Sequence, residues 1–164
     1  MRSHLMAIGA LAALSMVGSA HAATEIYTAT MDGAKETPPN TTVGYGQATV
    51  TLDTDSKVAT YNLSYMSLSG PAAAAHFHAG LPGAAGPPVV PITGDLSSPI
   101  VGKATLTDAQ IADLRAGKWY VNVHTAANKG GEIRGQVTAV DLSTKYLNGF
   151  GPSTLPSEPA NVKK

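Results

Sequence analysis

The feature that most constrains this fold is a regular alternation of apolar and polar residues in two neighbouring segments, 119–125 (WYVNVHT) and 132–137 (EIRGQV). A period of two residues is typical of β-strands, because successive side chains point to opposite faces of a sheet. The intervening residues 126–131 contain Asn and paired Gly, which favour turns. The sequence therefore predicts a β-hairpin with two different faces. One face carries Val121, Val123, Thr125, Ile133 and Val137, and the other carries Tyr120, Asn122, His124, Glu132, Arg134 and Gln136.

A second alternating segment, Ala75-His76-Phe77-His78, places both histidines on one side and Phe77 on the other. If Phe77 packs against the same core as the apolar face of the hairpin, the two histidines lie on the polar face with His124. We therefore expect three imidazole rings from two distant segments to lie close together.

Residues 1–22 have the pattern of a secretory signal peptide, with a basic start, a short apolar stretch and small residues before a predicted cleavage after Ala22. We therefore expect a periplasmic or secreted protein that is not held in a membrane once the signal is removed. Cleavage would remove two of the five histidines. The predicted mature chain keeps only His76, His78 and His124.

Charge and cysteine content exclude several classes of function. The chain has 11 basic and 11 acidic residues, and removal of Arg2 leaves ten basic residues against eleven acidic ones. This balance provides no basic surface for nucleic acid and no basic helix for a membrane surface. The absence of cysteine excludes disulfides, Cys-ligated zinc and Cys nucleophiles.

The other elements are predicted from alternation, turn residues and capping signals. One helix is expected to begin after Thr107, which has Gln110 three residues later, and to end before Gly117. Gly- and Pro-rich residues 80–91 are predicted to be irregular, and residues 142–164 to form a flexible tail. The expected fold of residues 23–141 is an all-β antiparallel Greek-key β-sandwich of the immunoglobulin or superoxide dismutase kind, with one short helix. Further strands are expected over residues 25–30, 44–52, 58–65, 72–78 and 100–105.

Three motifs resemble the CHRD (chordin-domain) family over about residues 24–141: residues 75–80 (AHFHAG), 114–125 (LRAGKWYVNVHT) and 130–136 (GGEIRGQ), preceded by an ETPP loop at residues 36–39. Ala79 and the Asn128-Lys129 step depart from the family pattern. The resemblance implies a β-sandwich module of exported proteins, and it implies little about biochemical activity.

The three histidines are a candidate copper or zinc site, because three neutral imidazoles leave one coordination position open. In this hypothesis Asn122 and Glu132 support the site by orienting an imidazole through its free N–H, and Arg134 holds an anion nearby.

Two alternatives remain. The polar face could be a hydrogen-bonded network in a non-enzymatic structural or protein-interaction module with an unknown protein partner. The order His76, His78, His124, Arg134 is also similar to that of copper–zinc superoxide dismutases, which suggests a redox enzyme. The zinc-site residues, the fourth copper histidine and the disulfide of those enzymes have no counterpart, so a non-catalytic role is favoured.

Overall fold

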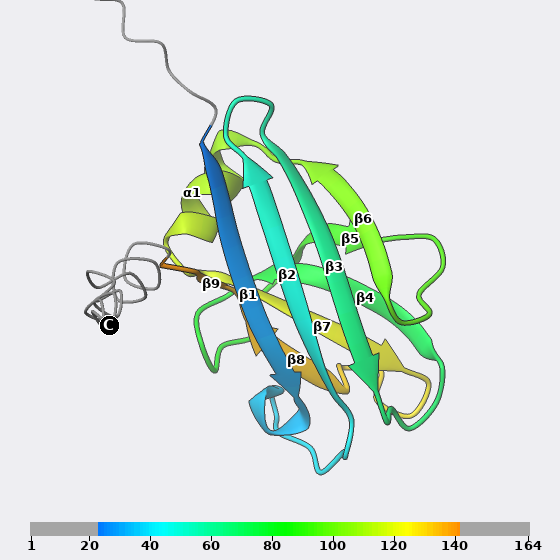
Figure 1. The fold of residues 1–164 in the computed structure, drawn as a ribbon. Coiled ribbons are helices and arrows are strands. Elements are labelled where there is room, and N and C mark those ends of the chain that lie inside the picture. The colour runs from blue at the N-terminus through cyan, green and yellow to red at the C-terminus, as the bar shows by residue number, and fades with distance from the viewer. Residues whose placement is uncertain (1–22, 142–164) are drawn as a thin grey trace, which may run out of the picture.

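The computed structural model describes residues 23–141, and the predicted signal peptide and tail lie outside them. Within this range one antiparallel sheet of nine strands is accompanied by a single α-helix, α1 (Asp108–Arg115), and a short 3-10 turn, η1 (Gly33–Lys35) (Figure 1). The strands are β1 (Thr24–Asp32), β2 (Tyr45–Asp53), β3 (Val58–Met66), β4 (Ala72–Ala79), β5 (Pro88–Ile92), β6 (Ile100–Thr105), β7 (Trp119–Thr125), β8 (Ile133–Gln136) and β9 (Thr138–Ala139).

The sheet follows the order β5-β4-β7-β8-β1-β2-β3-β6, with β9 also paired to β1. It folds over on itself, so that β1, β2, β3 and β6 face β4, β7 and β8 across the interior (Figure 1). The two halves are joined where β1 pairs with β8 at Asp32 and Arg134 and with β9 at Thr28 and Thr138. The predicted all-β antiparallel fold with one short helix is confirmed. The architecture found is a single, nearly closed, barrel-like sheet, and the Greek-key sandwich stays a prediction.

The core fills the space between the two halves, because each strand turns its apolar alternate residues inward. Tyr61 of β3 meets Phe77 of β4 edge-on with ring centroids 5.5 Å apart, and Trp119 of β7 lies 5.9 Å from Phe77. Val121 and Val123 have no exposed surface. The predicted apolar face of the central hairpin therefore packs into this core.

The helix is capped as the sequence predicted. The Thr107 side chain accepts a hydrogen bond from the backbone N–H of Gln110, the Gln110 side chain accepts one from the backbone N–H of Thr107, and Gly117 follows at φ +68. No helix among residues 23–141 is long and apolar enough to cross a membrane.

One strand contradicts the prediction of irregular structure for residues 80–91. Residues Pro88–Ile92 form β5, at the edge of the sheet beside β4. Proline lacks an N–H donor, but an edge strand needs hydrogen-bond donors on one side only and therefore tolerates it.

Candidate metal centre

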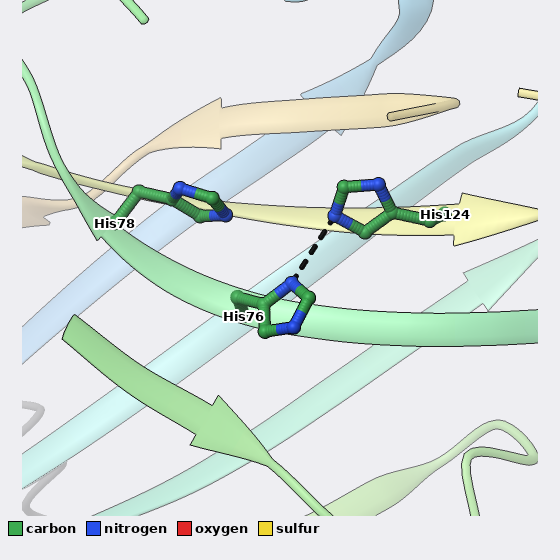
Figure 2. A group of neighbouring side chains, drawn as sticks. All are labelled: His76, His78 and His124. Carbon is green, nitrogen blue, oxygen red and sulfur yellow. Dashed lines mark hydrogen bonds between the residues drawn. The ribbon is translucent and has the colours of Figure 1, made fainter. Parts of the chain in front are cut away.

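Three adjacent strands position the candidate site. β7 lies between β4 and β8, and its residue Asn122 pairs with His76 on one side and with Arg134 on the other. His78 pairs with Tyr120, and His124 pairs with Ala74. Because alternate residues share a face, all three histidines project from the face of this half that lies away from the core. Figure 2 shows His76 and His78 on β4 and His124 on β7 turned toward one another.

The imidazole rings converge as the sequence predicted. One ring nitrogen from each of His76, His78 and His124 lies within 4.8 Å of the other two. The closest pair is His76 Nδ1 and His124 Nε2, at 3.2 Å (Figure 2). The prediction that two distant segments bring three histidines together is confirmed.

Backbone carbonyls fix the orientation of two of the rings. His78 Nδ1–H donates to the carbonyl oxygen of Gly86 at 2.8 Å, and His124 Nδ1–H donates to that of Lys129 at 2.9 Å. Each neutral ring then keeps a lone pair on Nε2. His78 Nε2 is buried and has no hydrogen-bond partner within residues 23–141. This arrangement is the one found around histidines that bind metals, where the other ring nitrogen donates to a carbonyl or carboxylate.

The separations suit a single small ion. Two ligands about 2.1 Å from a tetrahedral ion lie about 3.4 Å apart, and two on opposite sides lie about 4.2 Å apart. The observed 3.2 Å separation is close to the first distance, and the 4.8 Å limit exceeds the second by about 0.6 Å. Side-chain movements of less than about 1 Å would bring the three nitrogens onto one centre.

The environment of His76 and His124 disfavours the protonated form of both rings. Burial lowers the pKa of His76, and the neighbouring His124 and His78 rings lower it further. Burial also lowers the pKa of His124, against the opposing effect of the Lys129 carbonyl. A neutral imidazole is the form that donates a lone pair to a metal ion, so the burial that disfavours protonation also favours coordination.

Asn122 lies at the centre of the polar face, but it does not hold an imidazole. The side chain is 2% exposed, and its Oδ1 has no hydrogen-bond partner in the described part of the chain. The two Nδ1–H groups that Asn122 could have oriented donate to backbone carbonyls instead. Asn122 therefore does not orient His78 or His124 through Nδ1, and its predicted supporting role stays a prediction.

Glu132 was predicted to support the histidines, and its contacts contradict that role. Its carboxylate accepts hydrogen bonds from the Thr42 and Thr125 hydroxyls and from both the backbone N–H and the hydroxyl of Ser69. Glu132 comes just before β8, after Gly131 at φ +134, so the alternation within β8 does not govern its direction. The carboxylate faces Thr125, on the opposite side from His124. Its hydrogen bonds connect the segments that contain Thr42 and Ser69 to the end of β7.

Arg134 lies on the predicted face, one strand further from the histidines. It donates to the Thr37 hydroxyl at 2.8 Å and to the carbonyls of Ala84 and Leu81 at 2.8 and 3.3 Å. Its guanidinium carbon lies 3.5 Å from the centre of the Tyr120 ring. The Tyr120 ring contacts Arg134 and also stacks on His78, so it lies between these two side chains.

Sequence reasoning missed Tyr120 and Gly86 as parts of the site. The Tyr120 ring stacks on His78 at 4.7 Å and 10°, and its hydroxyl both donates to the Gly86 carbonyl and accepts from the Gly86 N–H at 3.2 Å. A Cβ at Gly86 would overlap the carbonyl of Ala79, so only glycine lets this loop approach β4. The alternation of side chains along β7 already placed Tyr120 on the same face as His124. No local sequence pattern predicts that the Gly86 carbonyl contacts His78.

Comparison with known proteins identifies the family. The model of the CHRD domain matches residues 27–137, which is more than half of the chain and includes all three histidines. No curated protein and no solved structure matches the chain. On the strength of the family match, the chain belongs to the CHRD domain family.

Proposed function

We propose that this CHRD domain binds one copper or zinc ion through His76 Nδ1, His78 Nε2 and His124 Nε2. The observation that supports this most is the combination of convergence and orientation. One ring nitrogen from each histidine lies within 4.8 Å of one from each of the others, and His78 and His124 each have their Nδ1–H bonded to a backbone carbonyl.

The donor set favours these two metals. Three imidazoles with an open fourth position suit zinc and copper, whereas calcium and magnesium prefer oxygen ligands. Copper(II) is expected to bind more tightly than zinc, following the general order of divalent-metal affinities.

A metal-free structural or protein-interaction module is the rival function, and one contact favours it. The 3.2 Å contact between His76 and His124 satisfies one nitrogen of each ring without an ion. The rival leaves the buried His78 Nε2 without a partner, and an unpaired buried polar atom destabilises a fold.

A dismutase-like redox activity has less support. Such an enzyme needs a cation beside the route by which an anion reaches the metal. The Arg134 guanidinium instead contacts Thr37 and the carbonyls of Leu81 and Ala84, behind the Tyr120 ring. We therefore propose a binding role rather than a catalytic one. We also propose a periplasmic or secreted location, on the basis of the sequence of residues 1–22.

Titration of the purified protein with Cu(II) and Zn(II) by isothermal calorimetry tests the proposal. We expect one ion per chain in the wild type and a large loss of affinity in His78→Ala and His124→Ala. Asn62→Ala is a suitable control, because Asn62 is exposed on β3 in the other half of the sheet. Stoichiometry and affinity that stay unchanged in both histidine variants would reject the site.

A further inference from the structure

Asn122 occupies the position on the polar face that adjoins all three histidines. It pairs directly with His76 across β4 and β7, it precedes His124 by two residues on β7, and it follows Tyr120, the partner of His78, by two. Neighbouring strands are about 4.8 Å apart and alternate residues about 7 Å apart, so the space among the three rings lies beside the Asn122 side chain.

The orientation of the Asn122 amide is set by Glu36, a residue outside the predicted site. A Cβ built on Gly131 would lie 2.8 Å from Asn122 Nδ2 and would overlap Glu36 Oε1. Both atoms therefore lie beside Gly131, so the Asn122 amide nitrogen is the end of the amide that faces Glu36. Gly131 belongs to the connection that leads into β8, whereas His76 lies on β4, on the other side of β7. With Nδ2 toward Glu36, the planar amide directs Oδ1 away from Glu36, and we infer from the strand order that Oδ1 is directed toward the histidine side.

Glu36 is buried deeply enough for its contact with Asn122 to matter. The residue is 6% exposed, and its Oε1 accepts no well-formed hydrogen bond within residues 23–141. Burial raises the pKa of this carboxyl above its usual value, and the Thr37 N–H, the Arg134 charge and the Asn122 amide offset only part of that rise. The amide therefore interacts favourably with the carboxylate in this orientation, and reversing the amide would place two oxygens together.

The glycine at position 131 makes this approach possible. Any side chain there would occupy the space that the Glu36 carboxylate takes beside Asn122. Its φ of +134 is also a conformation that other residues rarely adopt. The loop at residues 36–39 and the paired glycines of the central hairpin, both prominent in the sequence, therefore meet at one residue, Asn122.

The buried Oδ1 without a partner is an acceptor that needs a donor. A buried polar atom of this kind ordinarily bonds a water molecule when the protein supplies no donor. The candidate metal site has three protein ligands and one position open for water. We propose that Asn122 Oδ1 accepts a hydrogen bond from the water that completes the coordination of the bound ion, and that Glu36 is the residue that positions Asn122 for this contact.

This inference rests on the proposed metal site, and it predicts which ligand, water or a small anion, the fourth coordination position prefers. An amide oxygen carries partial negative charge, so it stabilises a water that donates to it and repels an anion in the same place. The domain should therefore hold water in the fourth position in preference to small anions. That preference also fits a binding protein better than an enzyme that draws an anion onto its metal.

Azide, an anion that competes with water for copper, provides the test. The protein loaded with Cu(II) is titrated with azide, and the azide-to-copper charge-transfer band gives the Kd. We expect the azide Kd to fall about tenfold in Asn122→Ala and in Glu36→Ala, and to stay near the wild-type value in Glu36→Gln, whose amide oxygen can still accept from Asn122 Nδ2. Asn62→Ala is the matched control for the Asn122 change. Electron paramagnetic resonance should show the same three nitrogen ligands in every variant.

The outcomes separate this inference from the metal site itself. Failure of the wild type to bind Cu(II) would overturn both. Binding through the three histidines with an unchanged azide Kd in Asn122→Ala and Glu36→Ala would overturn only the role of Asn122 and Glu36. A change in Asn122→Ala without a change in Glu36→Ala would overturn the role assigned to Glu36.

Discussion

His76 Nδ1 and His124 Nε2 lie 3.2 Å apart, although 48 positions separate the two residues in the sequence. His124 Nδ1–H donates to the Lys129 carbonyl, so a neutral His124 presents a lone pair at Nε2. The proton in the contact must then belong to His76 Nδ1. The geometry therefore assigns a tautomer to each ring, and coordination of a metal by His76 Nδ1 requires that proton to move to Nε2.

The first prediction concerns these tautomers. In the metal-free protein at neutral pH we expect all three rings to carry their proton on Nδ1. On addition of Zn(II), His76 should change to the Nε2–H form while His78 and His124 keep theirs. Long-range ¹H–¹⁵N NMR correlations of the imidazoles distinguish the two forms. An Nε2–H tautomer of His124 in the metal-free protein would contradict the assignment.

The second prediction concerns Glu132. Burial raises the pKa of its carboxyl, but the hydrogen bonds from Ser69, Thr125 and Thr42 outweigh burial and lower it from 4.5 to about 2. A carboxyl whose pKa is lowered on folding stabilises the protein above its unfolded pKa, and this stabilisation is lost as the pH falls through the folded pKa. We expect Glu132 to account for about 3 kcal/mol of stability that disappears between about pH 4.5 and 2.

Urea unfolding measured over this pH range checks the effect. Glu132→Gln should remove most of the pH dependence between pH 4.5 and 2, because it cannot titrate. Glu132→Ala should lower the free energy of unfolding by about 3 kcal/mol or more at pH 7, since it leaves buried donors unpaired. An unchanged pH profile in Glu132→Gln would show that other carboxyl groups carry the acid sensitivity.

Much of the fold was predictable because alternation is a local signal. β2, β3 and β7 alternate over their whole lengths, and each appears where the pattern placed it. β5 was missed because two prolines argue against a strand unless it is known to lie at an edge. The joining of both halves into one sheet depends on the pairing of β1 with β8 and β9, which no local pattern encodes.

The candidate site was predictable wherever side chains alternate regularly between the two faces of a strand. The alternation within β4 and β7 predicts that the three histidines share one face and that Asn122 lies among them. The same reasoning failed at Glu132, because that residue comes before β8 and follows a glycine with positive φ. The contacts of Gly86 and Glu36 come from loops whose paths are set by tertiary packing, so spacing along the chain does not reveal them.

The third prediction tests the support of His78. Tyr120→Phe keeps the ring that stacks on His78 but removes both hydrogen bonds to Gly86. Gly86 supplies the carbonyl that orients His78, so we expect metal affinity to fall about tenfold and stability to fall by about 1 kcal/mol. Calorimetric titration and thermal unfolding measure the two effects. Tyr45→Phe, at the exposed start of β2, is the control, and equal effects in both variants would argue against a role for the Tyr120 hydroxyl.

The fourth prediction concerns Arg134, which is 2% exposed and contacts Thr37, Leu81, Ala84 and the Tyr120 ring. A lysine keeps the charge but lacks the planar group that makes these contacts together. We expect Arg134→Lys to lower the free energy of unfolding by about 2 kcal/mol and to speed amide hydrogen exchange in residues 80–87.

Arg115→Lys is the matched control, because Arg115 is exposed and pairs with Glu25 at the surface, where the same change should cost less than about 1 kcal/mol. The loop braced by Arg134 carries the Gly86 carbonyl that orients His78, so faster exchange there should be accompanied by weaker Cu(II) binding. If exchange in residues 80–87 is no faster in Arg134→Lys than in Arg115→Lys, then Arg134 does not brace this loop, and the orientation of His78 depends on Tyr120 and the glycine at position 86 alone.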